Sequence, residues 1–216
     1  MRRWIAAAVF VVTLAGCGGS GTATNPGRPI TSPQALELAR VLLGDYQHAG
    51  SRLAGTYMVQ GQPLDFTGMI DFRTGTGELS LHQRSLPGQS ARTYYWTRRF
   101  VLTQVAPGSS DYLVRSPNPQ GQIVDHLISF LVLLSSPAID NIELLEHSGV
   151  RYLGSSGGLD RFREGARTLV TVNHSTGLLT AIHVGQTNGA TISVLLLSHG
   201  PHQITLPPRS DWRQQR

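Results

Sequence analysis

Beyond the N-terminal segment, the most apolar stretch of the chain covers residues 123–136, with the sequence IVDHLISFLVLLSS. The polar side chains among its first twelve residues are Asp125, His126 and Ser129, which share one narrow stripe at helical spacing. A helix that is apolar on nearly every side needs cover on nearly every side. The stretch is shorter than the roughly 17–25 apolar residues that cross a bilayer. The pattern therefore predicts a buried helix over residues 122–134.

A second helix is predicted over residues 32–50, SPQALELARVLLGDYQHAG. Ser32 is suited to cap its N-terminus, Pro33 to occupy the first helical position, and Gly50 to end it. The residues expected on its buried stripe are Leu36, Ala39, Leu43 and Tyr46.

From Ala54 onward the apolar residues recur with a period of two, in short segments separated by turn-forming Gly, Pro and Ser. In residues 64–72, for example, Leu64, Phe66, Ile70 and Phe72 share one face. Such alternation predicts antiparallel strands with one buried and one wet face. Strands are also predicted after the apolar helix, starting with residues 139–149, and one short edge strand is expected before Pro207-Pro208.

The predicted order is one helix, five or six strands, the apolar helix, and about five more strands. This order indicates an α+β fold, with one antiparallel sheet and helices on a single face. A chain of 216 residues is long enough for one domain with a sizeable core. We place that domain at residues 33–208 and a C-terminal tail at residues 209–216.

The N-terminus has the pattern of an export signal. MRR is followed by the apolar run WIAAAVFVVTLAG and then by Cys17, the one cysteine of the chain. The end of this run, LAGC, matches a bacterial lipobox, which predicts a signal peptide over residues 1–16 and lipidation of Cys17. Residues 17–32 are rich in Gly, Ser, Thr and Pro and are expected to be a flexible tether. The predicted location is the outer side of the cell membrane, held by two or three acyl chains.

Composition narrows the class of protein. The chain is 40% hydrophobic and 14% charged, which excludes a disordered protein. All 18 basic residues are Arg, and they are scattered along the chain rather than clustered as in a nucleic-acid-binding stripe. We therefore expect no nucleic-acid partner.

The sequence contains no pattern typical of catalysis, a cofactor or a metal centre. Asp125, His126 and Ser129 are residue types of a catalytic triad, but neighbouring residues on a helix do not face one another. We interpret them as the polar seam of a buried helix. His199 and His202 are the closest histidine pair, and Gly200-Pro201 between them favours a turn. No metal and no cofactor is predicted, and an enzyme with an unrecognised site remains an alternative.

The order of these features resembles the LppX/LprG lipoproteins of mycobacteria, which share the fold of the lipoprotein carriers LolA and LolB. The matching features are the lipobox at Cys17, the helix after a short tether, the hairpin FTGMIDFRTGTGELSL, the central apolar helix and the hairpin VNHSTGLLTAIHV, together with a last strand ending SHGPHQITLPP. The resemblance implies a strongly curved half-barrel sheet closed on its concave side by helices. It also implies an apolar cavity for acyl chains, with the central helix as its lid.

The helical spacing i, i+3, i+4, i+7 selects one stripe of the lid to face the apolar side of the 64–72 strand. The expected cavity residues are Leu127, Phe130, Leu131 and Leu134 on the lid and Phe66, Ile70 and Phe72 opposite. The predicted function is an anchored lipoprotein that binds acylated lipids or glycolipids in this cavity and carries or presents them across the cell envelope, with a membrane transporter as a further partner. The alternative is an interaction or sensor module of the envelope with a filled core and no lipid.

Overall fold

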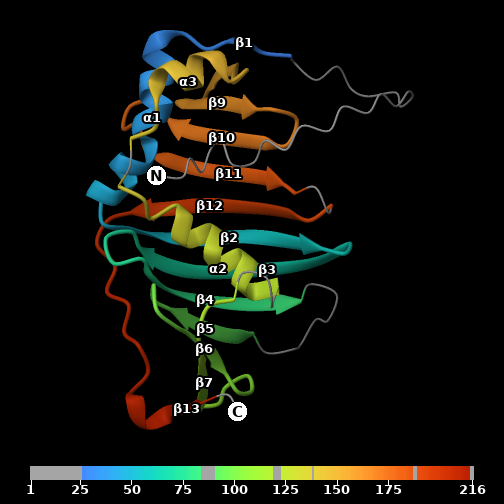
Figure 1. Ribbon diagram of the computed structural model, residues 1–216, viewed down its shortest axis with the longest axis vertical. Helices are drawn as coiled ribbons and strands as arrows, with labels where there is room; N and C mark the ends of the chain where they lie inside the picture. The colour runs from blue at the N-terminus through green and yellow to red at the C-terminus, as the bar shows by residue number, and fades with distance from the viewer. Residues whose placement is uncertain (1–25, 84–90, 119–122, 138, 187–188, 215–216) are drawn as a thin grey trace.

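The computed structural model describes residues 26–83, 91–118, 123–137, 139–186 and 189–214. Its strands form two antiparallel meanders, in which successive strands along the chain are neighbours in the sheet (Figure 1). The first consists of β2 (Gly50–Val59), β3 (Gln62–Asp71), β4 (Thr76–Gln83), β5 (Arg92–Trp96), β6 (Val101–Gln104) and β7 (Tyr112–Arg115). The second consists of β8 (Arg151–Ser156), β9 (Leu159–Glu164), β10 (Thr168–Asn173), β11 (Leu179–Gly185) and β12 (Thr191–His199).

The two meanders join into one sheet of 13 strands because β12 pairs antiparallel with β2. Two short strands extend its ends: β1 (Arg28–Pro29) pairs with β8, and β13 (Trp212–Gln214) pairs with β7. The pairing of β13 is parallel, so the sheet is mostly rather than wholly antiparallel. The helices are α1 (Ser32–Gln47), α2 (Ile123–Leu133) and α3 (Ile142–His147), and a 3-10 turn covers Arg209–Asp211.

The path of the chain explains where α2 lies. The segment after β7 must reach β8, which lies near the opposite end of the sheet. With neighbouring strands about 4.8 Å apart, this distance is roughly 50 Å. The segment therefore crosses a face of the sheet, and Figure 1 shows α2 running diagonally in front of its middle strands. A helix in this position is covered by the sheet, which is why its sequence is so apolar.

One face of the sheet carries a continuous row of apolar cross-strand partners. From β9 to β4 the row is Phe162, Val170, Ile182, Val194, Gly55, Phe66 and Leu81. Residues from α1, α2 and α3 belong to the same hydrophobic cluster as this row. The predicted arrangement, one apolar sheet face covered by helices, is confirmed at this level.

Two glycines of this face make room for aromatic rings. A Cβ on Gly55 would lie 2.4 Å from the Phe66 ring, and a Cβ on Gly77 would lie 1.9 Å from the Trp96 ring. Each ring therefore packs directly on the backbone of the neighbouring strand. Phe66 and Trp96 are 1% and 0% exposed as a result.

The first helix is confirmed, but its cap and its buried stripe differ from the prediction. Thr31 caps the helix one residue earlier than expected, because its backbone N–H donates to Gln34 Oε1 at 3.1 Å in a capping box. The buried residues of α1 are Ala35, Leu38, Ala39, Val41, Leu42 and Asp45. Leu36, Leu43 and Tyr46 lie at the edge of this stripe and are only partly buried.

The strand predicted over residues 139–149 is wrong, because most of this segment forms α3. The side chain of Asn141 accepts a hydrogen bond from the Leu144 N–H at 3.1 Å and thereby caps the helix. Residues 200–207 contain no edge strand either. The sheet is instead extended by β13, which follows Pro207 and Pro208. The sheet thus reaches beyond the predicted domain at both ends, into the expected tether through β1 and into the expected tail through β13.

Within the described residues, no helix has the length and apolar character to cross a membrane. The predicted signal peptide and Cys17 lie outside the described residues.

Candidate functional site

The structure brings the seven predicted cavity residues together. Phe66 and Ile70 lie on β3 with Phe72 just after it, and Leu127 and Leu131 lie on α2 with Leu134 just after it. These six are 0–1% exposed and belong to one hydrophobic cluster, against which Phe130 packs partly buried. An acyl chain between these six residues would have to displace packed side chains. Lipid binding at this position remains a prediction.

Part of the apolar surface of α2 and its neighbours faces solvent. Ile123 and Leu133 at its two ends are 45% and 48% exposed, and Ile139 in the following connection is 54% exposed. On α3, Leu144 is 41% exposed. The helix thus carries apolar side chains both toward the sheet and toward solvent. Burial in the core accounts only for those that face the sheet.

Asp125 attaches the first turn of α2 to the end of the first meander. Both its carboxylate oxygens accept hydrogen bonds from the guanidinium of Arg115 on β7, one of them from Nη2 at 2.6 Å. The N–H of Asn118 donates to Asp125 Oδ2 at 2.9 Å. The carboxylate of Asp125 is therefore engaged by an arginine and by a backbone N–H.

Arg115 was missed by the sequence analysis, although one signal was available. An arginine ends the short apolar segment YLVR, and an aspartate follows ten residues later in an apolar helix. Buried charges in such surroundings are found in pairs. The side chain of Asp125 is fully buried and that of Arg115 is 11% exposed.

Buried carboxyl groups that the sequence analysis also missed lie on α1 and on the second meander. Asp45 on α1 accepts a hydrogen bond from the Leu179 N–H at 3.2 Å and lies 3.3 Å from His199 Nε2. Burial raises the pKa of Asp45 in spite of these contacts. On β9, burial and then the charge of Asp140 raise the pKa of Glu164 to about 7.

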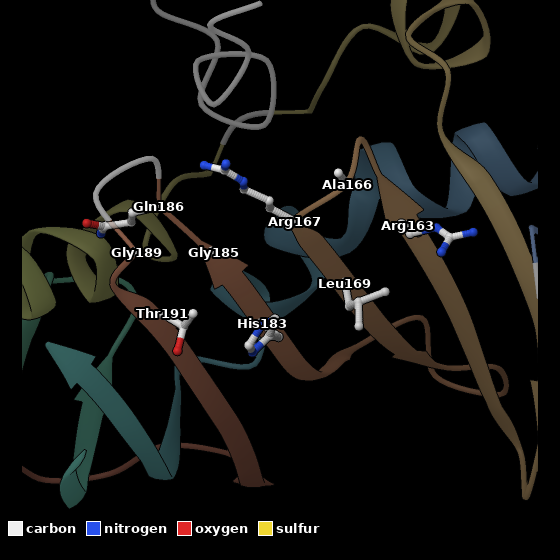
Figure 2. A pocket seen from close by; sticks show the side chains of 9 residues that line it. All are labelled: Arg163, Ala166, Arg167, Leu169, His183, Gly185, Gln186, Gly189 and Thr191. Carbon is white, nitrogen blue, oxygen red and sulfur yellow. The ribbon is translucent and has the colours of Figure 1, made fainter. Parts of the chain in front are cut away.

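Two open pockets lie away from α2. One, of about 450 Å³, lies on the face of the second meander opposite the core and is lined by Arg163, Arg167, Leu169 and His183 among others (Figure 2). The other, of about 650 Å³, lies between the β5–β6 turn and the C-terminal segment. Its lining combines arginines with aromatic rings: Arg98, Arg99, Arg209, Phe100 and Trp212. Both pockets suit anionic groups, and neither is lined by a predicted cavity residue.

Among the described residues, Glu37, Asp160 and His174 form a group whose ligand atoms are close enough to share a metal ion. None of the three was singled out by the sequence analysis, because α1, β9 and the turn after β10 supply one each and their spacing along the chain follows no metal-binding motif. The residues that were considered, His199 and His202, do not belong to this group.

No family model matches the chain, and no curated protein matches it. Solved structures with a similar arrangement include an uncharacterised conserved protein from Thermus thermophilus, with a TM-score of 0.43 and 9% identity over 86% of this chain and 100% of that one. MucB has a TM-score of 0.39 and 13% identity over 82% of this chain. A chain of the MucA/MucB complex of Pseudomonas aeruginosa has a TM-score of 0.36 and 14% identity over 79% of this chain. The chain covers 64% and 59% of the lengths of these last two structures.

Proposed function

We propose that the protein is a membrane-anchored lipoprotein of the cell envelope that binds acylated lipids or glycolipids between α2 and the apolar face of its sheet. In this proposal the sheet is the curved half-barrel of LolA-like and LppX/LprG-like carriers, and α2 is the lid. The protein works by binding and release, without chemistry, and passes its ligand to a membrane partner such as a transporter.

The observation that carries the proposal is the placement of α2. The helix crosses the sheet face with part of its apolar surface exposed to solvent, and a buried ion pair between Asp125 and Arg115 attaches its first turn to the sheet. If α2 turned away from the sheet about this attachment, the apolar surface uncovered on both elements would accept acyl chains.

A bulky substitution on the core side of α2 tests the proposal, and the same helix supplies the control. Leu131 is fully buried against the sheet, whereas Leu133 is 48% exposed on the outer side. The wild type, Leu131→Trp and Leu133→Trp would each be expressed in a lipid-rich host, purified as the full chain, and examined by native mass spectrometry and thermal unfolding.

We expect lipid to co-purify with the wild type and with Leu133→Trp, and to be lost from Leu131→Trp. Because Leu131 is packed in this structure, the added bulk should also lower the free energy of unfolding of Leu131→Trp by about 1–3 kcal/mol. Absence of lipid from the wild type, with the same loss of stability in Leu131→Trp, would show that α2 is an ordinary core helix.

The anchor is tested separately, with metabolic labelling by a clickable fatty acid. Cys17→Ala should abolish the labelling and release the protein from the membrane fraction, since the proposed anchor is a diacylglyceryl group joined to the Cys17 sulfur. Labelling that persists in Cys17→Ala would overturn the lipoprotein assignment.

The exposed apolar residues of α2 and α3 favour a second candidate function, an envelope interaction module with a filled core. Ile123, Leu133, Ile139 and Leu144 are all more than 40% exposed and would suit a partner protein. Native mass spectrometry separates the two candidates, because a bound lipid is required by the first and absent in the second.

A further inference from the structure

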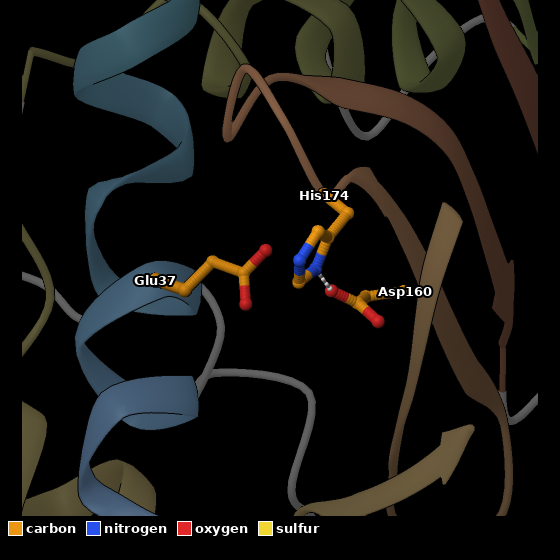
Figure 3. Close-up of side chains that lie close together, drawn as sticks. All are labelled: Glu37, Asp160 and His174. Carbon is orange, nitrogen blue, oxygen red and sulfur yellow. Dashed lines mark hydrogen bonds and ion pairs between the residues drawn. The ribbon is translucent and has the colours of Figure 1, made fainter. Parts of the chain in front are cut away.

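Three potential metal ligands converge where α1 meets the second meander. Glu37 comes from the first half of α1, Asp160 from β9, and His174 from the turn directly after β10. Figure 3 shows the imidazole of His174 between the two carboxylates, with Glu37 on the side of the helix and Asp160 on the side of the sheet. One ligand atom from each of the three side chains lies within 4.8 Å of the other two.

Asp160 is held firmly in this position. Its side chain is 4% exposed, and it accepts hydrogen bonds from the Tyr152 hydroxyl at 2.7 Å and from His174 Nδ1 at 2.6 Å. Burial alone would raise the pKa of Asp160, but the hydrogen bonds from His174, Tyr152 and Ser155 outweigh burial and lower it. The carboxylate is thus fixed in its charged form, which is the form that binds a cation.

Glu37 brings a second acidic group to the same place without a compensating donor. Its Oε1 atom is buried and has no hydrogen-bond partner. Burial, and then the nearby charge of Asp160, raise the pKa of Glu37. A buried carboxylate oxygen without a partner is costly, and its cost is removed when a cation binds it.

We propose that Glu37, Asp160 and His174 bind a divalent transition-metal ion, with zinc as the best match. Two carboxylate oxygens and one imidazole nitrogen form a ligand set that zinc accepts, whereas calcium and magnesium avoid nitrogen ligands. Ligands about 2.1 Å from a tetrahedral ion are about 3.4 Å from one another. His174 Nδ1 and Asp160 Oδ2 are 2.6 Å apart, so an ion between these two atoms would replace their hydrogen bond and separate them by about 0.8 Å. The other pairs of ligand atoms lie within 4.8 Å, and small side-chain rotations bring them to the ion.

The environment supplies the remaining requirements of such a site. The side chain of His174 is 70% exposed, so an ion can enter from solvent and keep a water molecule as its fourth ligand. The Tyr152 hydroxyl orients the Asp160 carboxylate, as outer hydrogen bonds commonly do around metal ions. The bound ion would join α1 to β9 and to the β10–β11 turn, next to the point where the chain enters the sheet through β1.

The test is zinc binding by the untagged full chain, with Cys17→Ser in every sample so that no thiol competes. Four proteins would be compared. They are the protein with the unsubstituted cluster, the variants Glu37→Gln and His174→Gln, and His147→Gln as a matched control. His147 is an exposed histidine on α3, outside the cluster. Zinc would be measured by elemental analysis after equilibrium dialysis, and its effect on stability by thermal unfolding with and without zinc.

We expect one zinc ion per chain and a higher melting temperature with zinc, both for the unsubstituted cluster and for His147→Gln. Glu37→Gln and His174→Gln should bind zinc at least tenfold more weakly and lose the thermal shift. Circular dichroism of the two variants without zinc checks that they are folded. Absence of zinc from the unsubstituted protein, or zinc binding that persists in both cluster variants, would overturn the proposal.

Discussion

The two meanders bury different kinds of groups beneath their helices. Under α2, the first meander buries aromatic rings and one ion pair in which the cation is an arginine. Under α1 and α3, the second meander buries Asp45, Asp160 and Glu164, whose neighbours are histidines and another carboxyl group. The second set contains groups that can change their charge under mild conditions.

This difference shows that one sheet can attach its helices in two ways. The attachment of α2 is a buried ion pair and should be sensitive to the loss of either partner. The attachment of α1 and α3 should vary with pH and tolerate neutral replacements. Substitutions at four positions test this contrast, in order of decreasing expected effect.

The largest effect should come from Arg115→Ala. This substitution leaves the Asp125 carboxylate buried without its counter-charge, which typically lowers the free energy of unfolding by about 3–5 kcal/mol. Urea unfolding measures the loss. Arg213→Ala is the matched control, because Arg213 pairs with Asp111 at 3.0 Å but its side chain is 65% exposed. We expect the control to lose about 0–1 kcal/mol. Equal losses in both variants would contradict the importance of the buried pair.

The next effect should be seen with Glu164→Gln as the pH changes. The pKa of Glu164 lies at about 7 in the folded protein, above the value of 4.5 for an unperturbed glutamate. The folded state therefore binds the extra proton, and its stability falls as pH rises between these values. Glutamine does not titrate. The free energy of unfolding of Glu164→Gln should therefore rise relative to that of the wild type by up to about 3 kcal/mol between pH 4.5 and pH 8. A constant difference across this range would refute the raised pKa.

A smaller pH effect is expected for Asp45→Asn. Burial raises the pKa of Asp45 above its usual value, so the wild type should lose stability as pH rises from about 4 through the folded-state pKa. Asparagine keeps an acceptor for the Leu179 N–H and removes the titration. Urea unfolding of both proteins at several pH values should show a shallower pH dependence for Asp45→Asn. If both curves have the same slope, Asp45 is not the titrating group.

The smallest effect on stability is expected at the outer side of α2. Leu133→Gln replaces a side chain that is 48% exposed, so the free energy of unfolding should change by no more than about 0.5 kcal/mol. Leu131→Ala, on the core side of the same helix, should lower the free energy of unfolding by about 2–5 kcal/mol. A large loss in Leu133→Gln would mean that the outer side of α2 is covered.

The sequence predicted the parts of the fold that depend on local pattern. The alternation of Phe66 and Ile70 with polar neighbours identified the buried face of β3, and the apolar run after Gln122 identified α2. It failed at α3, where Ile142, Leu144 and Leu145 were interpreted as a strand although Asn141 was a good N-cap. The parallel pairing of β13 with β7 could not be foreseen, because it joins segments about a hundred residues apart without a sequence signal.

The polar sites were harder to predict than the core. Arg115 with Asp125 and Asp45 with His199 each combine residues from different elements, so their partners depend on the strand order. That order places β12 beside β2, which no periodicity reveals. Six of the seven predicted cavity residues are fully buried, because helical and strand spacing determined the faces on which they lie. Their role in lipid binding stays a prediction.

The junction between β12 and β2 has a consequence for synthesis and export. The chain leaves the ribosome N-terminus first, so β2 is available long before β12, which begins at Thr191. Until then the ten residues of β2 present an unpaired edge, and such edges promote aggregation. Closing this long-range pairing is also slow, because the loop entropy is lost before the contacts form. A chain that terminates before Thr191 is therefore expected to yield an aggregation-prone fragment rather than a smaller folded domain.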